Sequence, residues 1–325
     1  MPLLLPAAVV FLAAVTTKEL DLEGHRGTRG LAPENTLAAF ARALAIGVTT
    51  LELDLGLTRD GVVVVGHDPR LNPDIVRGPD GAWLHAPTPA IFSLTYAELS
   101  TYDAGRLRPG SAYAARFPDQ LPRDGERMPR LADVYALAER AGAEDVRFNI
   151  EIKTDPRTPQ DTAVPEDLTD AALKVVRAAG MEKRTTIQSF EWRSVRRVRE
   201  QAPGLRTSCL TSEQPGDDTI QIGRGKSPWL GGLDPAAYGN SVPRLVKAAG
   251  AEVWSPSYQD VTKERIAEAH ALGLFVLVWT VNEPAEMVRI IELGVDGIIS
   301  DRPDLLRAVM VGRGMKVPAP APVRP

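Results

Sequence analysis

The chain has 325 residues, of which 44% are hydrophobic and 25% charged, an ordinary composition for a globular protein with a large core. Its formal net charge of −4 gives no indication of a nucleic-acid-binding protein. The single cysteine, Cys209, excludes an intrachain disulfide and a zinc–thiolate site, and we expect it to be a buried, inert thiol. The length suits one β/α barrel with insertions as well as it suits two domains.

The N-terminus begins with an apolar run, Leu3–Val15, that has the length of a signal peptide but lacks a preceding basic residue. It is too short to span a membrane, and no other segment reaches that length, so we expect no stable membrane insertion. We therefore interpret residues 1–17 as a signal peptide or N-terminal extension. Export to the periplasm or the medium is the expectation, and a cytoplasmic location is the alternative.

From residue 20 to residue 300, short runs rich in Val, Ile and Leu alternate with amphipathic stretches, the pattern of repeated β/α units. Eight strands with intervening helices predict an α/β protein, a single closed TIM-type (β/α)8 barrel over residues 18–312. The predicted strands are Leu20–Gly24, Thr50–Leu55, Arg147–Ile152, Thr185–Ser189, Arg206–Leu210, Glu252–Pro256, Leu274–Thr280 and Gly297–Ser300. The predicted helices include one begun by Leu37, a short one at Tyr96–Thr101, and others near Asp167–Ala179, Trp192–Gln201, Val242–Ala249, Thr262–Leu272 and Pro284–Leu293.

A ninth strand-like run, Val62–Gly66, follows the second strand after a turn that is too short for a parallel crossover. We predict an antiparallel hairpin over Leu55–Val65, and centring it between residues 59 and 60 places His67 across from Glu52. The Pro- and Gly-rich insertion of residues 69–130 is long enough to be a functional cap. The Pro- and Ala-rich tail, residues 313–325, is predicted to be disordered.

Charged side chains occur inside predicted strands that are otherwise apolar. Glu52 and Asp54 share one face of the second strand, and Glu151 and Lys153 share one face of the third. Three converging carboxylates suit one divalent cation, Mg²⁺, Ca²⁺ or Mn²⁺, because these hard cations prefer oxygen ligands. The alternative is a buried ion network in which the carboxylates pair with Arg26 and Lys153.

Two histidines, His25 and His67, lie at the ends of strands next to this cluster. A pair of histidines beside a metal site is suited to general acid and base catalysis at neutral pH. Arg26 and Lys153 have the charge and geometry to hold phosphate oxygens. The active sites of such barrels lie at the C-terminal ends of the strands, where all of these residues fall.

Further residues are candidates for supporting roles. Glu34 could orient Arg26 or a histidine, and Asn35 joins it behind the site, although Asn35 or Thr36 also suits a helix N-cap. Gln188 ends the fourth predicted strand and could donate a hydrogen bond into the site. Trp279 could stack on a glycerol backbone, or it could be a core tryptophan.

The ordered set of motifs strongly resembles the glycerophosphodiester phosphodiesterase family, whose barrel is similar to that of phosphatidylinositol phospholipase C. The resemblance implies hydrolysis of a small glycerophosphodiester to sn-glycerol 3-phosphate and an alcohol. It further implies a divalent cation on the three carboxylates, acid–base roles for both histidines, and phosphate binding by Arg26 and Lys153. The matching residues are His25-Arg26-Gly27, Pro33-Glu34-Asn35-Thr36, Glu52-Leu53-Asp54, His67-Asp68, Glu151-Ile152-Lys153, Gln188-Ser189-Phe190 and Gly297–Pro303.

Two other functions remain open at this point. A lipid-directed phosphodiesterase of the phospholipase C or D type would need an apolar rim, which Trp83, Ile91 and Phe92 could supply. A non-catalytic phosphodiester-binding protein would keep the cations and could lose a histidine or a ligand, but none is missing here. The sequence leaves undecided the head group, the metal, which histidine is the acid, whether a cyclic phosphate forms, and the oligomeric state.

Overall fold

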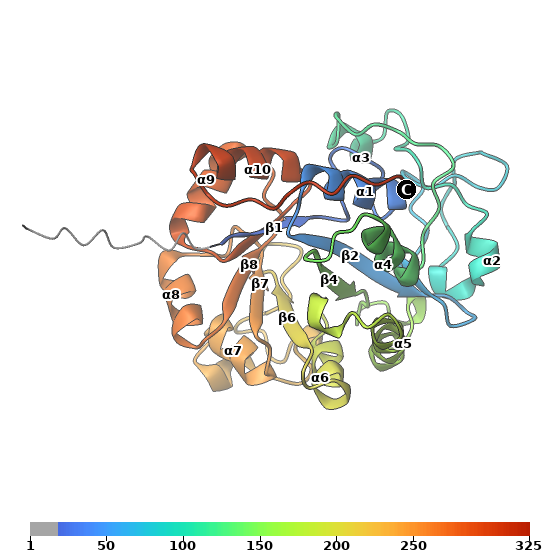
Figure 1. The fold of residues 1–325 in the computed structure, drawn as a ribbon. Helices are drawn as coiled ribbons and strands as arrows, with labels where there is room; N and C mark the ends of the chain where they lie inside the picture. Colours follow the sequence, from blue (N-terminus) through green and yellow to red (C-terminus); the bar gives the residue numbers. More distant parts are fainter. Residues whose placement is uncertain (1–18) are drawn as a thin grey trace, which may run out of the picture.

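The computed structural model describes residues 19–325, so the predicted signal peptide or extension lies outside the described residues. Eight parallel strands form a closed barrel in the order β1-β9-β8-β7-β6-β5-β4-β2, and β1 pairs with β2 to close it. Helices surround the strands (Figure 1), so the predicted TIM-type barrel is confirmed. The strands are β1 Asp21–Gly24, β2 Thr50–Leu57, β3 Val63–Val65, β4 Arg147–Ile152, β5 Thr185–Ser189, β6 Arg206–Thr211, β7 Val253–Pro256, β8 Phe275–Val278 and β9 Gly297–Ser300.

The predicted helices are present, and the described chain contains three more that the sequence reading did not name: α3, α4 and α10. The apolar residues from Leu131 to Ala138 have the spacing of a helix and indicate α4, but they directly follow the irregular insertion and were not separated from it. The helices are α1 Leu37–Ile46, α2 Tyr96–Leu99, α3 Ala112–Ala115, α4 Leu131–Arg140, α5 Pro165–Ala178, α6 Trp192–Gln201, α7 Val242–Ala249, α8 Lys263–Ala271, α9 Pro284–Leu293 and α10 Pro303–Gly312. Short 3₁₀ turns occur at Ile91–Ser93, Pro159–Asp161, Glu182–Arg184, Pro228–Leu230 and Pro235–Tyr238. None of the described helices is both long and apolar enough to cross a membrane.

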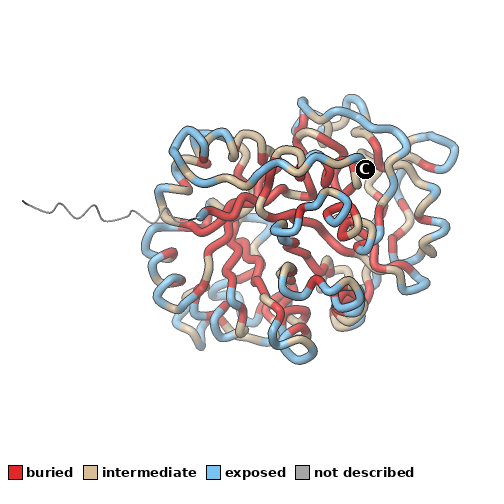
Figure 2. The backbone as a smooth tube through the Cα atoms, viewed as in Figure 1, coloured by how far each residue is buried: buried red, intermediate tan, exposed pale blue. Residues whose placement is uncertain are grey.

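Alternation along each strand separates the main hydrophobic core from the barrel interior. On β2, Leu51, Leu53 and Leu55 are fully buried in the layer between the strands and the helices. The residues between them, Glu52 and Asp54, point the other way, into the barrel. Figure 2 shows the strands buried along almost their whole length, whereas the exposed backbone gathers on the helices and loops.

The hairpin between β2 and β3 is antiparallel as predicted, but its register differs by one residue. Leu55 pairs with Val65, so the centre falls on residue 60 and His67 comes opposite Leu53, not Glu52. The cause is a three-residue turn in which Gly61 adopts a left-handed conformation with φ of 78°. A turn with an odd number of residues shifts the register by one place relative to a turn with an even number.

The insertion, residues 69–130, folds over one side of the barrel mouth around a small apolar cluster of its own. Val64 on the hairpin joins Leu71, Val76, Ile91 and Leu99 in this cluster, and all five are buried. The insertion therefore has a fixed structure built partly on the hairpin.

The C-terminal tail, expected to be disordered, lies along the barrel in this structure. The Ala321 backbone N–H donates to the Leu44 carbonyl at 2.8 Å, and the Arg307 guanidinium donates to the Pro318 carbonyl at 2.7 Å. Composition favours disorder, but spaced apolar residues supply a packing surface. The tail residues packed against the core are Met315, Val317, Ala321 and Val323.

Candidate active site

A cavity of about 430 Å³ opens at the C-terminal ends of the barrel strands, a size suited to a small ligand. Three predicted site residues, Asp54, Glu34 and Asn35, are buried behind its wall. The other predicted site residues line the cavity directly: His25, Arg26, Glu52, His67, Glu151, Lys153, Gln188 and Trp279. The structure thus brings together the whole predicted set.

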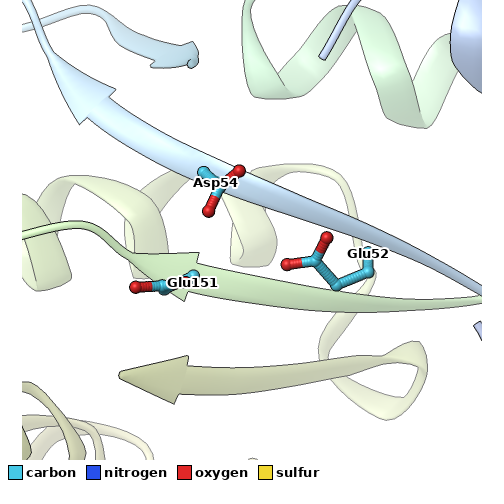
Figure 3. Close-up of side chains that lie close together, drawn as sticks. All are labelled: Glu52, Asp54 and Glu151. Carbon is cyan, nitrogen blue, oxygen red and sulfur yellow. The ribbon is translucent and has the colours of Figure 1, made fainter. Parts of the chain in front are cut away.

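Glu52, Asp54 and Glu151 form a compact carboxylate cluster on two neighbouring strands (Figure 3). Asp54 on β2 stands beside Glu151 on β4 in the sheet register, and Glu52 precedes Asp54 on the same face. One oxygen of each carboxylate lies within 4.8 Å of the others, and all three residues are buried. Such oxygen ligands can surround one hard divalent cation.

Two of the three carboxylates have a raised pKa, because the neighbouring cations do not offset the cost of burying their negative charge. Burial and the neighbouring Asp54 raise the pKa of Glu52 well above its ordinary value. Burial likewise raises the pKa of Glu151 to about 7, against the opposing effect of Lys153. Burial also disfavours ionised Asp54, but Arg26, His67 and Lys153 outweigh it and hold the pKa of Asp54 far below the usual range.

The ion-network alternative accounts for only two of these carboxylates. The Arg26 Nε lies 3.3 Å from Asp54, and the Lys153 Nζ lies 2.9 Å from Glu151. Glu52 faces neither cation within ion-pair distance; it accepts hydrogen bonds from the Arg26 backbone N–H at 2.8 Å and from the Gln188 amide at 2.9 Å. The remaining negative charge fits a divalent cation.

His25 follows β1 and is held from β9 by a carboxylate. Its Nδ1 lies 2.6 Å from Asp301, which accepts from the Arg29 guanidinium at 2.8 and 3.0 Å and from the Asn282 amide at 2.8 Å. Since Asp301 can only accept, Nδ1 carries the proton in the neutral ring and Nε2 offers a lone pair. Burial, with Arg29 nearby, lowers the pKa of His25 to about 4.

His67 repeats this arrangement on the hairpin side of the cavity. Its Nδ1 lies 2.7 Å from Asp68, which also accepts from the Asn72 amide at 2.8 Å. Burial and the charges of Arg26 and Lys153 lower the pKa of His67. The ring is 26% exposed against 12% for His25, so it is the more accessible of the two.

Arg26 is fixed by its surroundings before any ligand binds. Its backbone has φ of 49°, a left-handed conformation that is uncommon for a residue with a side chain. The guanidinium donates to Glu34 at 2.7 Å, while the Asn35 amide donates to Asp54 at 2.9 Å. Thr36, not Asn35, caps helix α1. Glu34 and Asn35 therefore hold Arg26 and Asp54 from behind.

Gln188 on β5 and Trp279, which follows β8, also line the cavity. Gln188 accepts from the Asn149 amide at 3.0 Å, and Asn149 also donates to Glu23 at 2.9 Å, which fixes the orientation of the amide that holds Glu52. The Trp279 ring meets Phe190 edge-on, with ring centroids 5.4 Å apart, and its indole N–H donates to a backbone carbonyl.

Several residues around the cavity escaped the sequence reading. Asp301 lies in the motif Gly297–Pro303, directly after the last strand, and this position at a strand end is typical of an active-site residue. Arg29 and Asn282 lie in loops after strand ends. Tyr113 and Arg116 come from the insertion, which has no periodic pattern that could place them.

A closed β/α barrel that carries two histidines, cationic side chains and a carboxylate cluster at its mouth is suited to the hydrolysis of a phosphoric diester. Residues 25–305 match the model of the glycerophosphoryl diester phosphodiesterase family, and the chain belongs to this family.

Individual relatives agree with this assignment. The chain is 30% identical to a glycerophosphodiester phosphodiesterase of Caldanaerobacter subterraneus subsp. tengcongensis, with 87% of this chain and 94% of the relative covered. A solved structure from Silicibacter pomeroyi DSS-3, assigned as a glycerophosphoryl diester phosphodiesterase, superposes with a TM-score of 0.82 at 38% identity, covering 92% and 95% of the two chains. An Oleispira antarctica phosphodiesterase in complex with sn-glycerol 3-phosphate shares the fold, with a TM-score of 0.65 at 20% identity over 89% and 96% of the chains.

Proposed function

We propose that this protein hydrolyses small glycerophosphodiesters to sn-glycerol 3-phosphate and an alcohol, using one divalent cation and two histidines. The observation that carries the proposal is the pairing of His25 with Asp301 and of His67 with Asp68 in the cavity that holds the carboxylate cluster. The names of the family and of the relatives, one of which binds sn-glycerol 3-phosphate, support the same substrate class.

Glu52, Asp54 and Glu151 would hold the cation, Mg²⁺, Ca²⁺ or Mn²⁺. When bound, such an ion offsets the charge of the phosphodiester and makes phosphorus more open to attack. Arg26 and Lys153 would then contact phosphate oxygens, because the carboxylates that now partner them would have another cation to bind.

His25 and His67 would divide the proton transfers. One neutral ring accepts the proton of the attacking hydroxyl through its free Nε2, and the other, protonated, donates to the departing alcohol oxygen. The nucleophile is either water or the neighbouring glycerol hydroxyl, which would give a cyclic phosphate first. Each aspartate keeps its ring oriented and stabilises the protonated form.

The lipid-directed alternative is disfavoured by the positions of its proposed rim. Ile91 is 3% exposed in the cluster of the insertion, and Trp83 stacks against Arg77 at 5.9 Å. Only Phe92, at 40% exposure, remains available among these three residues. A non-catalytic binding role is disfavoured because both histidines and all three carboxylates are present and converge. Export through residues 1–17 stays a prediction.

The test is release of sn-glycerol 3-phosphate from glycerophosphocholine by protein stripped with EDTA and then supplied with Mg²⁺, Ca²⁺ or Mn²⁺ singly. We expect at least one ion to restore turnover, and we expect vesicles of phosphatidylcholine to be poor substrates. Turnover that is unaffected by EDTA would contradict the metal. Preferential cleavage of the vesicles would establish the lipid-directed function instead.

A further inference from the structure

Four cationic side chains line the active-site cavity, and three of them are paired with carboxylates. Arg26 pairs with Glu34, Arg29 with Asp301, and Lys153 with Glu151. The fourth is Arg116, which has no carboxylate within ion-pair distance anywhere in residues 19–325. The single negative charge of the reacting phosphodiester is already assigned to Arg26 and Lys153, so Arg116 is left to bind a second anionic group.

Arg116 is held over the cavity by an aromatic platform. It directly follows α3, and its guanidinium lies 5.5 Å from the Tyr113 ring centroid and 5.4 Å from that of Phe117. Phe117 is buried beneath Arg29, and the Tyr113 hydroxyl donates to Glu34. Because Glu34 also holds Arg26, the platform is tied directly to the reaction centre.

The two sides of the cavity differ in character. Arg116 and Tyr113 lie beside residues that follow β1 and β9, whereas Phe190 follows β5, which stands opposite β9 in the ring of strands. On the Phe190 side, the rings of Phe190 and Trp279 suit the carbon backbone of glycerol, and the cation over Phe190, Lys153, is paired with Glu151. On the other side, the cation Arg116 is unpaired within the part of the chain that the structure describes. The alcohol on the other side of the phosphate would face Arg116.

We propose that Arg116 binds an anionic group on the alcohol portion of the substrate, so that the enzyme favours glycerophosphodiesters whose head group carries a carboxylate or a second phosphate. The planar guanidinium matches both groups in a two-pronged hydrogen-bonded pair, and stacking on Tyr113 and Phe117 pre-orients it. The inference rests on the proposed function and specifies its substrate class.

Two matched pairs of substrates test it. Glycerophosphoserine and glycerophosphoethanolamine differ by a carboxylate, and glycerophosphoinositol phosphate and glycerophosphoinositol differ by a phosphate. In at least one pair, we expect kcat/KM to be about tenfold higher for the anionic member, equivalent to about 1.4 kcal/mol. The pair that shows the preference identifies which anion is recognised. Added salt should reduce the preference, because the charges are partly exposed.

Arg116→Gln should abolish the preference while leaving kcat/KM for the less charged member nearly unchanged, and Arg116→Lys should retain part of it. Arg42→Gln is the matched control, since Arg42 is exposed on α1 and has the same charge change outside the cavity. Equal kcat/KM within both pairs, or an equal loss on both members in Arg116→Gln, would overturn the inference. Failure to release sn-glycerol 3-phosphate from any of the four would instead refute the proposed function.

Discussion

The barrel interior has a polar half and an apolar half. On β7, β8 and β9 the inward residues Val253, Leu277 and Ile299 form an apolar cluster, as is usual for such barrels. Most inward residues of the first five barrel strands are polar instead, with Leu210 on β6 as an exception, and they include the carboxylate ligands. The main polar residues are Glu23, Glu52, Asp54, Asn149, Glu151, Gln188 and Ser208.

The polar half of the barrel interior carries the reacting groups, whereas the apolar half contributes packing. Buried charges cost several kcal/mol each unless they are paired or bind a metal, so a polar barrel interior lowers stability and persists where a reaction requires it. The apolar half fills the same space at no such cost. Substitutions in the polar half should therefore change turnover most, and those in the apolar half should change stability most.

The largest effect on turnover should come from the histidines. His25→Ala and His67→Ala should each lower kcat by about 10²–10⁴-fold while KM stays similar, because proton transfer is lost and not binding. Steady-state kinetics on glycerophosphocholine measures both parameters. A His25→Ala protein with the turnover of the unaltered enzyme would end the acid–base assignment.

Asp301 follows β9, a strand of the apolar half, yet it contacts His25. It therefore tests whether residues next to the apolar half also affect turnover. Asp301→Asn should lower kcat by about 10–100-fold, because His25 loses its orienting partner. It should also reduce stability, since it leaves the buried Arg29 guanidinium without its ion-pair partner.

The same residue makes a pH prediction. Burial opposes ionised Asp301, but Arg29 and His25 hold its pKa well below the ordinary value. The stability that this provides is present above about pH 4, the ordinary aspartate pKa, and is lost as the pH falls through the lower pKa of the folded state. Urea unfolding of the unaltered protein and of Asp301→Asn between pH 3 and pH 7 measures the difference between their free energies of unfolding. This difference should narrow toward pH 3, and a constant difference would contradict the electrostatic explanation.

Asn149 probes the polar half away from the ligands. Asn149→Leu should lower kcat/KM by about tenfold, because Gln188 loses the amide that orients it toward Glu52. Metal affinity should fall in parallel, which a purely structural role would not cause. Unchanged metal affinity would show that Glu52 does not depend on this line of hydrogen bonds.

Leu277 in the apolar half should give the reverse pattern and the smallest change in turnover. Leu277→Ala should reduce the free energy of unfolding by about 2–5 kcal/mol through the cavity it leaves, while kcat changes only a few-fold. A large loss of turnover in a folded Leu277→Ala protein would show that the apolar half also shapes the site.

The two halves also differ in how far the sequence predicts them. Charges alternating within β2 and β4 can be read directly, because a charged residue in an apolar strand has few structural explanations. Asp301 and Arg29 lie beyond strand ends, where alternation no longer applies, and Arg116 lies in an insertion fixed by tertiary contacts. The register of the hairpin depends on the left-handed conformation of Gly61. The order of the tail depends on packing against the core, which composition does not reveal.

The most direct test of the account is calorimetric titration of the EDTA-stripped protein with Mg²⁺, Ca²⁺ or Mn²⁺, compared with Glu52→Gln and His25→Ala. The account predicts one cation per chain in the unaltered protein, greatly weakened binding in Glu52→Gln, and nearly unchanged binding in the inactive His25→Ala protein. Binding that survives in Glu52→Gln, or no binding to any of the three ions, would contradict a metal site on the carboxylate cluster.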